Sequence, residues 1–531
     1  MRISQRMLRN LALVCCLSAL IFHPAKAGAD WLQDFELDAV TWMTEAAIPG
    51  MAIAIVQNKT VIYAKGFGHL SVDPDSPEVD ANTVFSIGSC SKAFGAAMVA
   101  MIEDQKQLAW SDPVSSHLSY FQMYDPWVNK QFQVQDLLCH RSGLIPYSLF
   151  PMLFTGYPSA TQVQGIRFKQ PSTSFRTAFA YQNHMYVAAS KLVEAKTGQS
   201  WGDNISDTIF KPLGMTRSVT TQDAVNQMDN VASGHLLLTD GSLSPISPNW
   251  YLNYYFDDNA LAAGAIRSTA NDMAQWMLLN LALGTWGSQQ IISTANMQFL
   301  QAPWVLIAPW ANGPSSPYWG PVSYGGGWQY FGLSPQPLIT HDGTMPGFKT
   351  SVMLVPGANI GVVILTNIGM NITGNPSLGT RSGVSQKLAF RFYDLYFDRQ
   401  TSTAELDQFV RKTQEIFEPA SSASIPATAN KTPALPLKSY CGVYYHPSYG
   451  NFTVSLVSGN LVMTMGPQNL QSNLAPAGGN TFWAYMPDVP ANYPMYIPVT
   501  FAFPVYGGPA TMTINTVMGW PQNDVFTRKK H

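Results

Sequence analysis

The chain has 531 residues, of which 46% are hydrophobic and 12% are charged, and its formal net charge is −2 at pH 7. A chain of this size and composition is globular and able to bury large hydrophobic cores. It lacks the excess of basic residues that is typical of nucleic-acid-binding proteins, so we predict no nucleic-acid partner.

Residues 1–27 have the pattern of a signal peptide. A basic start, an apolar run and a small-residue cleavage site follow one another, at Arg2, Arg6 and Arg9, at Leu11 to Phe22 and at Ala25 to Ala27. The apolar run is too short to span a bilayer. We therefore expect cleavage near Gly28, export to the periplasm or the medium, and no transmembrane anchor.

Strand patterns lie at both ends of the next segment. The runs Met51 to Val56 and Val61 to Ala64 flank a turn at Asn58-Lys59, which predicts a β-hairpin. Two further strands are predicted at residues 351–355 and 361–365, with helix-rich sequence between about 93 and 281. This order predicts an α/β sandwich whose sheet draws on both ends of the segment.

Ser89 and Lys92 stand three residues apart at the start of the apolar helical run 93–102. Residues at this spacing share one face of a helix. A serine near a helix N-terminus with an amine beside it is suited to form an acyl-enzyme, because the lysine can take the hydroxyl proton. The alternative interpretation is a buried helix with an incidental serine.

Residues 198–202, Gly-Gln-Ser-Trp-Gly, match the G-x-S-x-G pattern of α/β-hydrolases, with Ser200 as the nucleophile. That elbow requires an apolar strand before the serine. The preceding residues, 185–196, have helical periodicity instead, so Gly198 is better interpreted as a helix C-cap. Lys196-Thr197-Gly198 matches the pattern K-T-G literally. It lies at the same predicted helix end, however, where its backbone could not flank an acyl group as the edge of a strand does.

The C-terminal part changes character twice. Residues 401–437 are predicted to form a helix and a linker rich in Pro, Ala and Ser. From 438 to 531, alternating strands separated by Ser458-Gly459-Asn460 and by Gly507-Gly508 predict a small antiparallel β-barrel.

Three cysteines remain after the predicted cleavage, Cys90, Cys139 and Cys441. An odd number with no close pair excludes a disulfide scaffold but leaves one bridge open. The chain contains no CxxC or HExxH pattern, so we predict no metal and no cofactor.

Four more segments accompany Ser89 and Lys92: Leu137 to Leu144 (LLCHRSGL), Tyr181-Gln182-Asn183, Pro212 to Met215 (PLGM) and His341-Asp342-Gly343. On these motifs the chain resembles the serine β-lactamase and penicillin-binding-protein superfamily, specifically class C β-lactamase-like serine hydrolases related to D-Ala-D-Ala carboxypeptidases. The resemblance covers most of residues 40–370. It implies a domain over 28–400 with an antiparallel sheet and a helical subdomain.

The Y-x-N pattern also occurs at Tyr251 and Tyr449. Tyr181 is chosen because it lies between the Ser-Lys helix and the H-D-G triplet and precedes the helical run 185–195. The resemblance then implies that Tyr181 relays protons and that Asn183 binds the amide of the substrate.

The resemblance places His341-Asp342-Gly343 where relatives have K-T-G, and it implies an oxyanion hole made by the backbone N–H groups of Ser89 and Thr344. His341 and Gly343 would line the substrate site. His140 is interpreted as a turn support beneath it. A histidine at position 341 is mostly neutral at pH 7, so recognition of a substrate carboxylate should weaken, unless Asp342 keeps the imidazole partly charged.

The leading hypothesis is an exported serine hydrolase that forms an acyl-Ser89 intermediate on peptide amides, D-amino-acid peptides, esters or β-lactams, without strong β-lactamase activity. Two alternatives stay open: an α/β-hydrolase that uses Ser200, and a sensor or penicillin-binding protein that acylates slowly without turnover. The segment 438–531 resembles the lipocalin-like domain of such hydrolases, which implies a role at the site mouth, in a homo-oligomer, or in stability alone.

Overall fold

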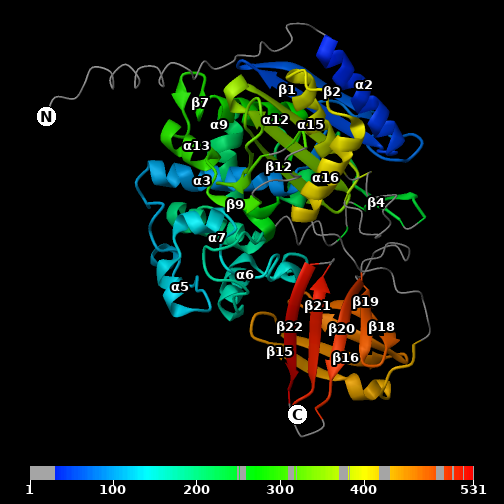
Figure 1. The fold of residues 1–531 in the computed structure, drawn as a ribbon. Helices are drawn as coiled ribbons and strands as arrows, with labels where there is room; N and C mark the ends of the chain where they lie inside the picture. The colour runs from blue at the N-terminus through cyan, green and yellow to red at the C-terminus, as the bar shows by residue number, and fades with distance from the viewer. Residues whose placement is uncertain are drawn as a thin grey trace, which may run out of the picture.

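The computed structural model describes residues 30–238, 240–247, 250, 259–308, 316–318, 320–369, 381, 383–417, 431–485, 496–504, 508–517 and 520–529. Two bodies are visible, an α/β domain and a smaller C-terminal barrel (Figure 1). The predicted signal peptide and residues 418–430 of the predicted linker lie outside the described residues. Within the described part, no helix has both the length and the apolar character that crossing a membrane requires.

An antiparallel sheet of eight strands is the frame of the larger body. Its order is β2-β1-β14-β13-β12-β11-β10-β9, so the N-terminal hairpin pairs with a strand from the end of the domain, as the sequence predicts. The strands are β1 (Gly50–Gln57), β2 (Thr60–Gly68), β9 (Val305–Ala308), β10 (Val322–Tyr324), β11 (Gln329–Phe331), β12 (Leu338–Met345), β13 (Phe348–Val355) and β14 (Ile360–Thr366).

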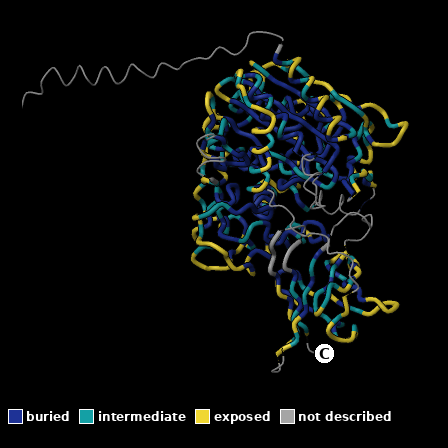
Figure 2. Tube along the Cα trace, turned by 45° about the vertical axis from the view of Figure 1, so that its right-hand side comes forward, coloured by how far each residue is buried: buried dark blue, intermediate teal, exposed yellow. Residues whose placement is uncertain are grey.

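The central strands are apolar on both faces because helices cover both. In β1, Ile53 and Ile55 face the core under α2 (Asp30–Glu45), α15 (Val384–Tyr396) and α16 (Thr403–Phe417). Ala52 and Ala54 face the opposite core, which includes α12 (Ala270–Leu281). This alternation follows from the period of two in a strand. Figure 2 shows the resulting buried interior.

A helical subdomain packs beyond the second face. Its long helices are α3 (Ser91–Asp104) and α7 (Asn183–Thr197), which contact each other. Shorter helices complete the body: α4 (Val114–His117), α5 (Pro126–Gln131), α6 (Ser159–Gly165), α8 (Trp201–Ile205), α9 (Lys211–Leu213), α10 (Gln222–Val225) and α13 (Thr294–Gln301). Three small hairpins or bridged pairs are β3 (Phe85–Ser86) with β6 (Arg267–Ser268), β4 (His235–Leu237) with β5 (Leu243–Pro245), and β7 (Thr285–Trp286) with β8 (Gln289–Gln290).

The C-terminal body is a closed antiparallel barrel of eight strands, which confirms the predicted architecture. Its strands are β15 (Gly442–His446), β16 (Gly450–Val457), β17 (Asn460–Met465), β18 (Leu470–Gly478), β19 (Thr481–Tyr485), β20 (Tyr496–Ala502), β21 (Thr511–Val517) and β22 (Trp520–Arg528). Pairing of β15 with β22 closes it. Alternate residues such as Phe452 and Val454 are buried, as expected for a barrel interior.

A buried polar cluster joins the barrel to the helical subdomain. Lys169 forms an ion pair with Asp524 of β22, and both side chains are almost completely buried. The Tyr449 hydroxyl donates to the other oxygen of Asp524 at 2.7 Å, and the Tyr157 hydroxyl donates to the Tyr449 carbonyl at 2.6 Å. These bonds satisfy charges that would otherwise be costly to bury.

The Asp524→Asn variant should destabilise this junction, because it leaves the buried Lys169 ammonium without its counter-charge. We expect a loss of about 3 kcal/mol in unfolding free energy, measured by denaturant unfolding. The matched control is Asp207→Asn, which breaks the exposed pair with Lys211 and should leave stability unchanged. Equal stability of the two variants would contradict a structural role for the cluster.

Candidate active site

Ser89 lies in a short 3-10 turn, Gly88–Cys90, that leads directly into α3. The serine itself is half-buried, whereas the first two turns of α3 are fully buried. Gly88 adopts φ +48°, which turns the chain from β3 into the helix. The serine therefore precedes the helix proper rather than opening it, and it still stands one turn from Lys92.

Lys92 is completely buried, and its Nζ contacts three oxygen atoms. These are Ser89 Oγ at 3.0 Å, Asn183 Oδ1 at 2.8 Å and the Ala263 carbonyl at 2.7 Å. Burial lowers the pKa of Lys92 well below its ordinary value, because the charged form loses its hydration. The environment thus favours the neutral amine.

A neutral amine has two N–H donors and one lone pair. The carbonyl oxygens of Asn183 and Ala263 can only accept, so they take the two N–H groups. The lone pair then remains for the hydroxyl hydrogen of Ser89. In this protonation state, Lys92 is arranged to remove the proton from Ser89.

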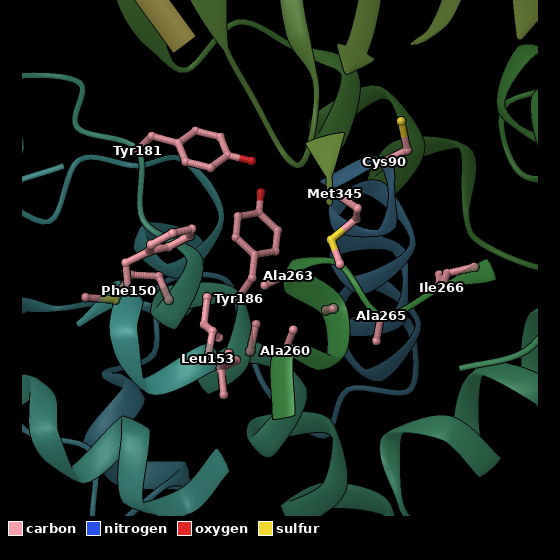
Figure 3. Packing of buried hydrophobic residues seen from close by; sticks show 14 of the residues in the cluster. Cys90, Phe150, Leu153, Tyr181, Tyr186, Ala260, Ala263, Ala265, Ile266 and Met345 are labelled. Atoms are coloured by element: carbon pink, nitrogen blue, oxygen red, sulfur yellow. The ribbon is translucent and has the colours of Figure 1, made fainter. Parts of the chain in front are cut away.

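Tyr181 and Asn183 reach the same place from the start of α7. Asn183 is the first residue of that helix, and its bond to Lys92 uses Oδ1, so the Nδ2 donors remain for the predicted substrate contact. The Tyr181 ring lies 4.8 Å from Lys92 Nζ and stacks on Tyr147. In Figure 3 the hydroxyl groups of Tyr181 and Tyr186 extend toward the same region.

His140 supports this turn from beneath, in the manner proposed from the sequence. It is fully buried, its ring centroid lies 4.2 Å from that of Tyr181, and its Nδ1 accepts the backbone N–H of Gln182 at 3.0 Å. Burial lowers its pKa well below the ordinary value. A neutral His140 therefore fixes the backbone between Tyr181 and Asn183.

The backbone of β12 passes directly against the Ser89 turn. A Cβ at Gly343 would stand 1.8 Å from the Ile87 carbonyl oxygen and 3.2 Å from Ser89 N. A Cβ at Gly88 would stand 3.0 Å from Thr344 N. Only glycine permits this approach. The fold thus brings together the two backbone amides, of Ser89 and Thr344, that the sequence analysis assigned to an oxyanion hole.

Both ring nitrogens of His341 are engaged within the protein. Its Nδ1 lies 2.7 Å from the Asp342 carbonyl, which can only accept, so Nδ1 carries the proton. Its Nε2 therefore accepts from the Tyr324 hydroxyl at 2.9 Å. Burial lowers the pKa of His341 to about 3, because the charged imidazolium would lose its hydration. A direct contact with substrate would require one of these bonds to be exchanged.

The suggestion that the Asp342 carboxylate keeps His341 charged is wrong in this geometry. The carboxylate belongs to the opposite face of β12, because successive strand residues alternate. Its oxygens accept from Ser351 Oγ at 2.6 Å and from Gln386 Nε2 at 2.8 Å. Only the backbone carbonyl of Asp342 bonds to the imidazole, which stays neutral at pH 7.

Sequence reasoning missed three buried side chains at this site. Lys349 of β13 donates to Thr344 Oγ1 at 2.6 Å, Tyr324 bonds to His341, and Tyr186 donates to the Leu138 carbonyl at 2.6 Å. The two-residue turn Pro346-Gly347 signals the register that places Lys349 opposite Thr344. No local motif marks either tyrosine.

The structure contradicts the α/β-hydrolase alternative. Ser200 lies between two helices and is the N-cap of α8, not the tip of a strand-to-helix elbow. It is exposed, and its hydroxyl is bonded to the Asp203 carboxylate at 2.6 Å. Gly198 is the left-handed C-cap of α7, as expected, so Lys196-Thr197-Gly198 is a helix end. Cys90, Cys139 and Cys441 are all free.

The fold and the Ser-Lys site are those of a serine hydrolase. Comparison with protein families agrees: the family model described as Beta-lactamase matches residues 36–379, and the chain belongs to this family. Residues 426–527 match a domain of unknown function, DUF3471, which covers the barrel.

Two curated proteins and one solved structure are similar over long stretches. The "Unguisins hydrolase ungD" of Aspergillus violaceofuscus is 28% identical over 440 residues, covering 78% of this chain and 75% of that protein. "Penicillin-binding protein 4" of Amycolatopsis lactamdurans is 26% identical over 356 residues, covering 64% and 86%. The octameric penicillin-binding protein homologue from Pyrococcus abyssi shares the fold, with a TM-score of 0.56, 20% identity and coverage of 94% and 100%.

The Gly343→Ala variant should abolish the close approach of β12 to the Ser89 turn. The added methyl would push the strand outward and misalign the two amides, so we expect reaction of Ser89 with an active-site probe to slow by about 100-fold. The matched control is Gly165→Ala in α6, where a Cβ would meet only ordinary contacts at 3.5 Å. A wild-type rate for Gly343→Ala would refute the proposed arrangement.

Proposed function

We propose that this chain is an exported hydrolase that cleaves amide or ester bonds through an acyl-Ser89 intermediate. The observation that carries the proposal is the set of three oxygen contacts at Lys92 Nζ. With Lys92 neutral, the carbonyls of Asn183 and Ala263 take its two N–H groups, and the lone pair is left for the Ser89 hydroxyl. The hydrolase name of the Aspergillus relative supports the same class of reaction.

In the first step, Ser89 Oγ attacks the carbonyl carbon of the substrate while Lys92 takes the hydroxyl proton. The negative charge that develops on the carbonyl oxygen is stabilised by the N–H groups of Ser89 and Thr344. The proton then passes to the leaving amine or alcohol, with Tyr181 as the proposed relay. Water attack on the ester of Ser89 completes hydrolysis in a second cycle of the same groups.

The substrate class follows from the charges at the site. His341 is neutral, and both of its ring nitrogens are hydrogen-bonded within the protein. The triplet in the place of K-T-G therefore carries no cation at its first position. A strict requirement for a substrate carboxylate is therefore disfavoured. Short peptides, D-aminoacyl amides and esters are the proposed substrates, and strong β-lactamase activity is not expected.

A second candidate is a penicillin-binding or sensor protein that is acylated but turns over very slowly. The similarity to penicillin-binding protein 4 favours it. It requires the same acyl-Ser89 adduct and differs only in the rate of deacylation. Export, which rests on residues 1–27, and assembly into a homo-oligomer are further proposals.

Intact-mass measurement with a neutral fluorophosphonate tests the nucleophile. We expect one added label on the wild type and on the matched control Ser200→Ala, and none on Ser89→Ala. Equal labelling of Ser89→Ala would contradict the proposal, and loss of labelling only in Ser200→Ala would restore the α/β-hydrolase hypothesis.

The same measurement over time separates the two candidates. A penicillin, a cephalosporin, a D-Ala-D-Ala peptide, a D-aminoacyl amide and a nitrophenyl ester serve as acyl donors. Product release with return of the unmodified mass supports a hydrolase, whereas an adduct that persists with every donor supports the slow-turnover protein.

A further inference from the structure

A buried lysine stands next to the proposed oxyanion hole without belonging to any of the motifs. Lys349 is 1% exposed and lies on β13, directly opposite Thr344 of β12. Its Nζ donates to Thr344 Oγ1 at 2.6 Å. Thr344 is the residue whose backbone N–H, on the proposed mechanism, receives the substrate oxyanion.

The position of Lys349 brings its charge close to the reacting groups. The pKa of His341 is lowered mainly by burial, and Lys349 contributes in the same direction. Lys349 also acts on Cys90, the residue that follows Ser89. Two groups beside the Ser89 turn and β12, Cys90 and His341, therefore experience the field of this side chain.

We infer that Lys349 is a positioning residue for acyl transfer, which holds Thr344 through its hydroxyl and adds positive charge beside the Thr344 N–H. The inference rests on the proposed acyl-Ser89 function. Lys349 would stabilise the transition state more than the bound substrate, because the oxyanion charge appears only as the carbonyl is attacked.

The near-complete burial of Lys349 favours this role over direct capture of a charged substrate. An ammonium that is 1% exposed and bonded to a threonine hydroxyl offers little surface to a ligand. In a water-poor site, however, a charge acts over several ångströms with little screening. With His341 neutral, this neighbouring strand supplies the cation that the H-D-G triplet lacks.

Steady-state hydrolysis of an uncharged nitrophenyl ester and fluorophosphonate labelling test the inference. Lys349→Met removes the charge and keeps the length of the side chain, Lys349→Arg restores the charge, and Thr344→Val removes the hydroxyl while keeping the N–H. We expect Lys349→Met to lower kcat and the labelling rate by about 10- to 100-fold, with KM changed by less than about 3-fold. Lys349→Arg should recover most of the loss.

A double-mutant cycle checks that Lys349 acts through Thr344. Lys349→Met should cost less in the Thr344→Val background than in the wild type, because the tether is already absent. Wild-type rates for Lys349→Met would overturn the inference. So would equal losses for the Met and Arg variants accompanied by equal losses of thermal stability, which indicate a purely structural role.

A third overturning result would be a rise in KM restricted to carboxylate-bearing donors, with unchanged kcat on the neutral ester. That pattern would make Lys349 a substrate anchor instead. Failure of the proposed function is recognised separately, because the wild type would then not be labelled at Ser89 at all, and the inference would fall with it.

Discussion

The burial of Lys92 is the constraint on which the site depends. A lysine removed from water favours its neutral form, and here two obligate acceptors, the carbonyls of Asn183 and Ala263, consume its N–H groups. The remaining lone pair of the neutral amine can then accept a hydrogen bond from the Ser89 hydroxyl, which lies within hydrogen-bond distance of Nζ. Lys92 can act as the base for Ser89 only when three elements have packed together: α3, α7 and the turn at Ala263. Activation of the nucleophile therefore depends on tertiary structure.

The second constraint is the contact between β12 and the Ser89 turn. Gly343 lets the backbone of the strand approach the backbone of the turn closely, because it has no Cβ. The two imidazoles beside this contact are neutral. His140 accepts a hydrogen bond from the Gln182 backbone N–H, and His341 bonds to the Tyr324 hydroxyl and to the Asp342 carbonyl. Lys349 on the next strand donates to Thr344 Oγ1, and the positive charge beside the Thr344 N–H is the one that we infer for this side chain. The neutral imidazoles of His140 and His341, together with the inferred charge of Lys349, suit a reaction in which negative charge appears only transiently on the substrate.

Local patterns predicted much of this. The hairpin β1-β2, the helix α7 with its Gly198 cap and the barrel hairpins depend on turn residues and periodicity within a few positions. The Ser89–Lys92 contact is also local, since three residues make nearly one helical turn. By contrast, Ala263 is 171 residues from Lys92, and no pattern connects them. The partners of His341 and the position of Lys349 likewise depend on strand register and packing, which is why the Asp342 hypothesis was wrong.

The protonation state of Lys92 in the resting protein is the most direct test of this account. Nuclear magnetic resonance of the protein labelled with nitrogen-15 in its lysine side chains, with the Lys92 signal assigned by its loss in Lys92→Met, would follow that amine as the pH rises. The account predicts that Lys92 loses its proton well below the ordinary lysine value, because its charged form is buried. A Lys92 that stays charged until about pH 10.4, the value of an unperturbed lysine, would contradict it.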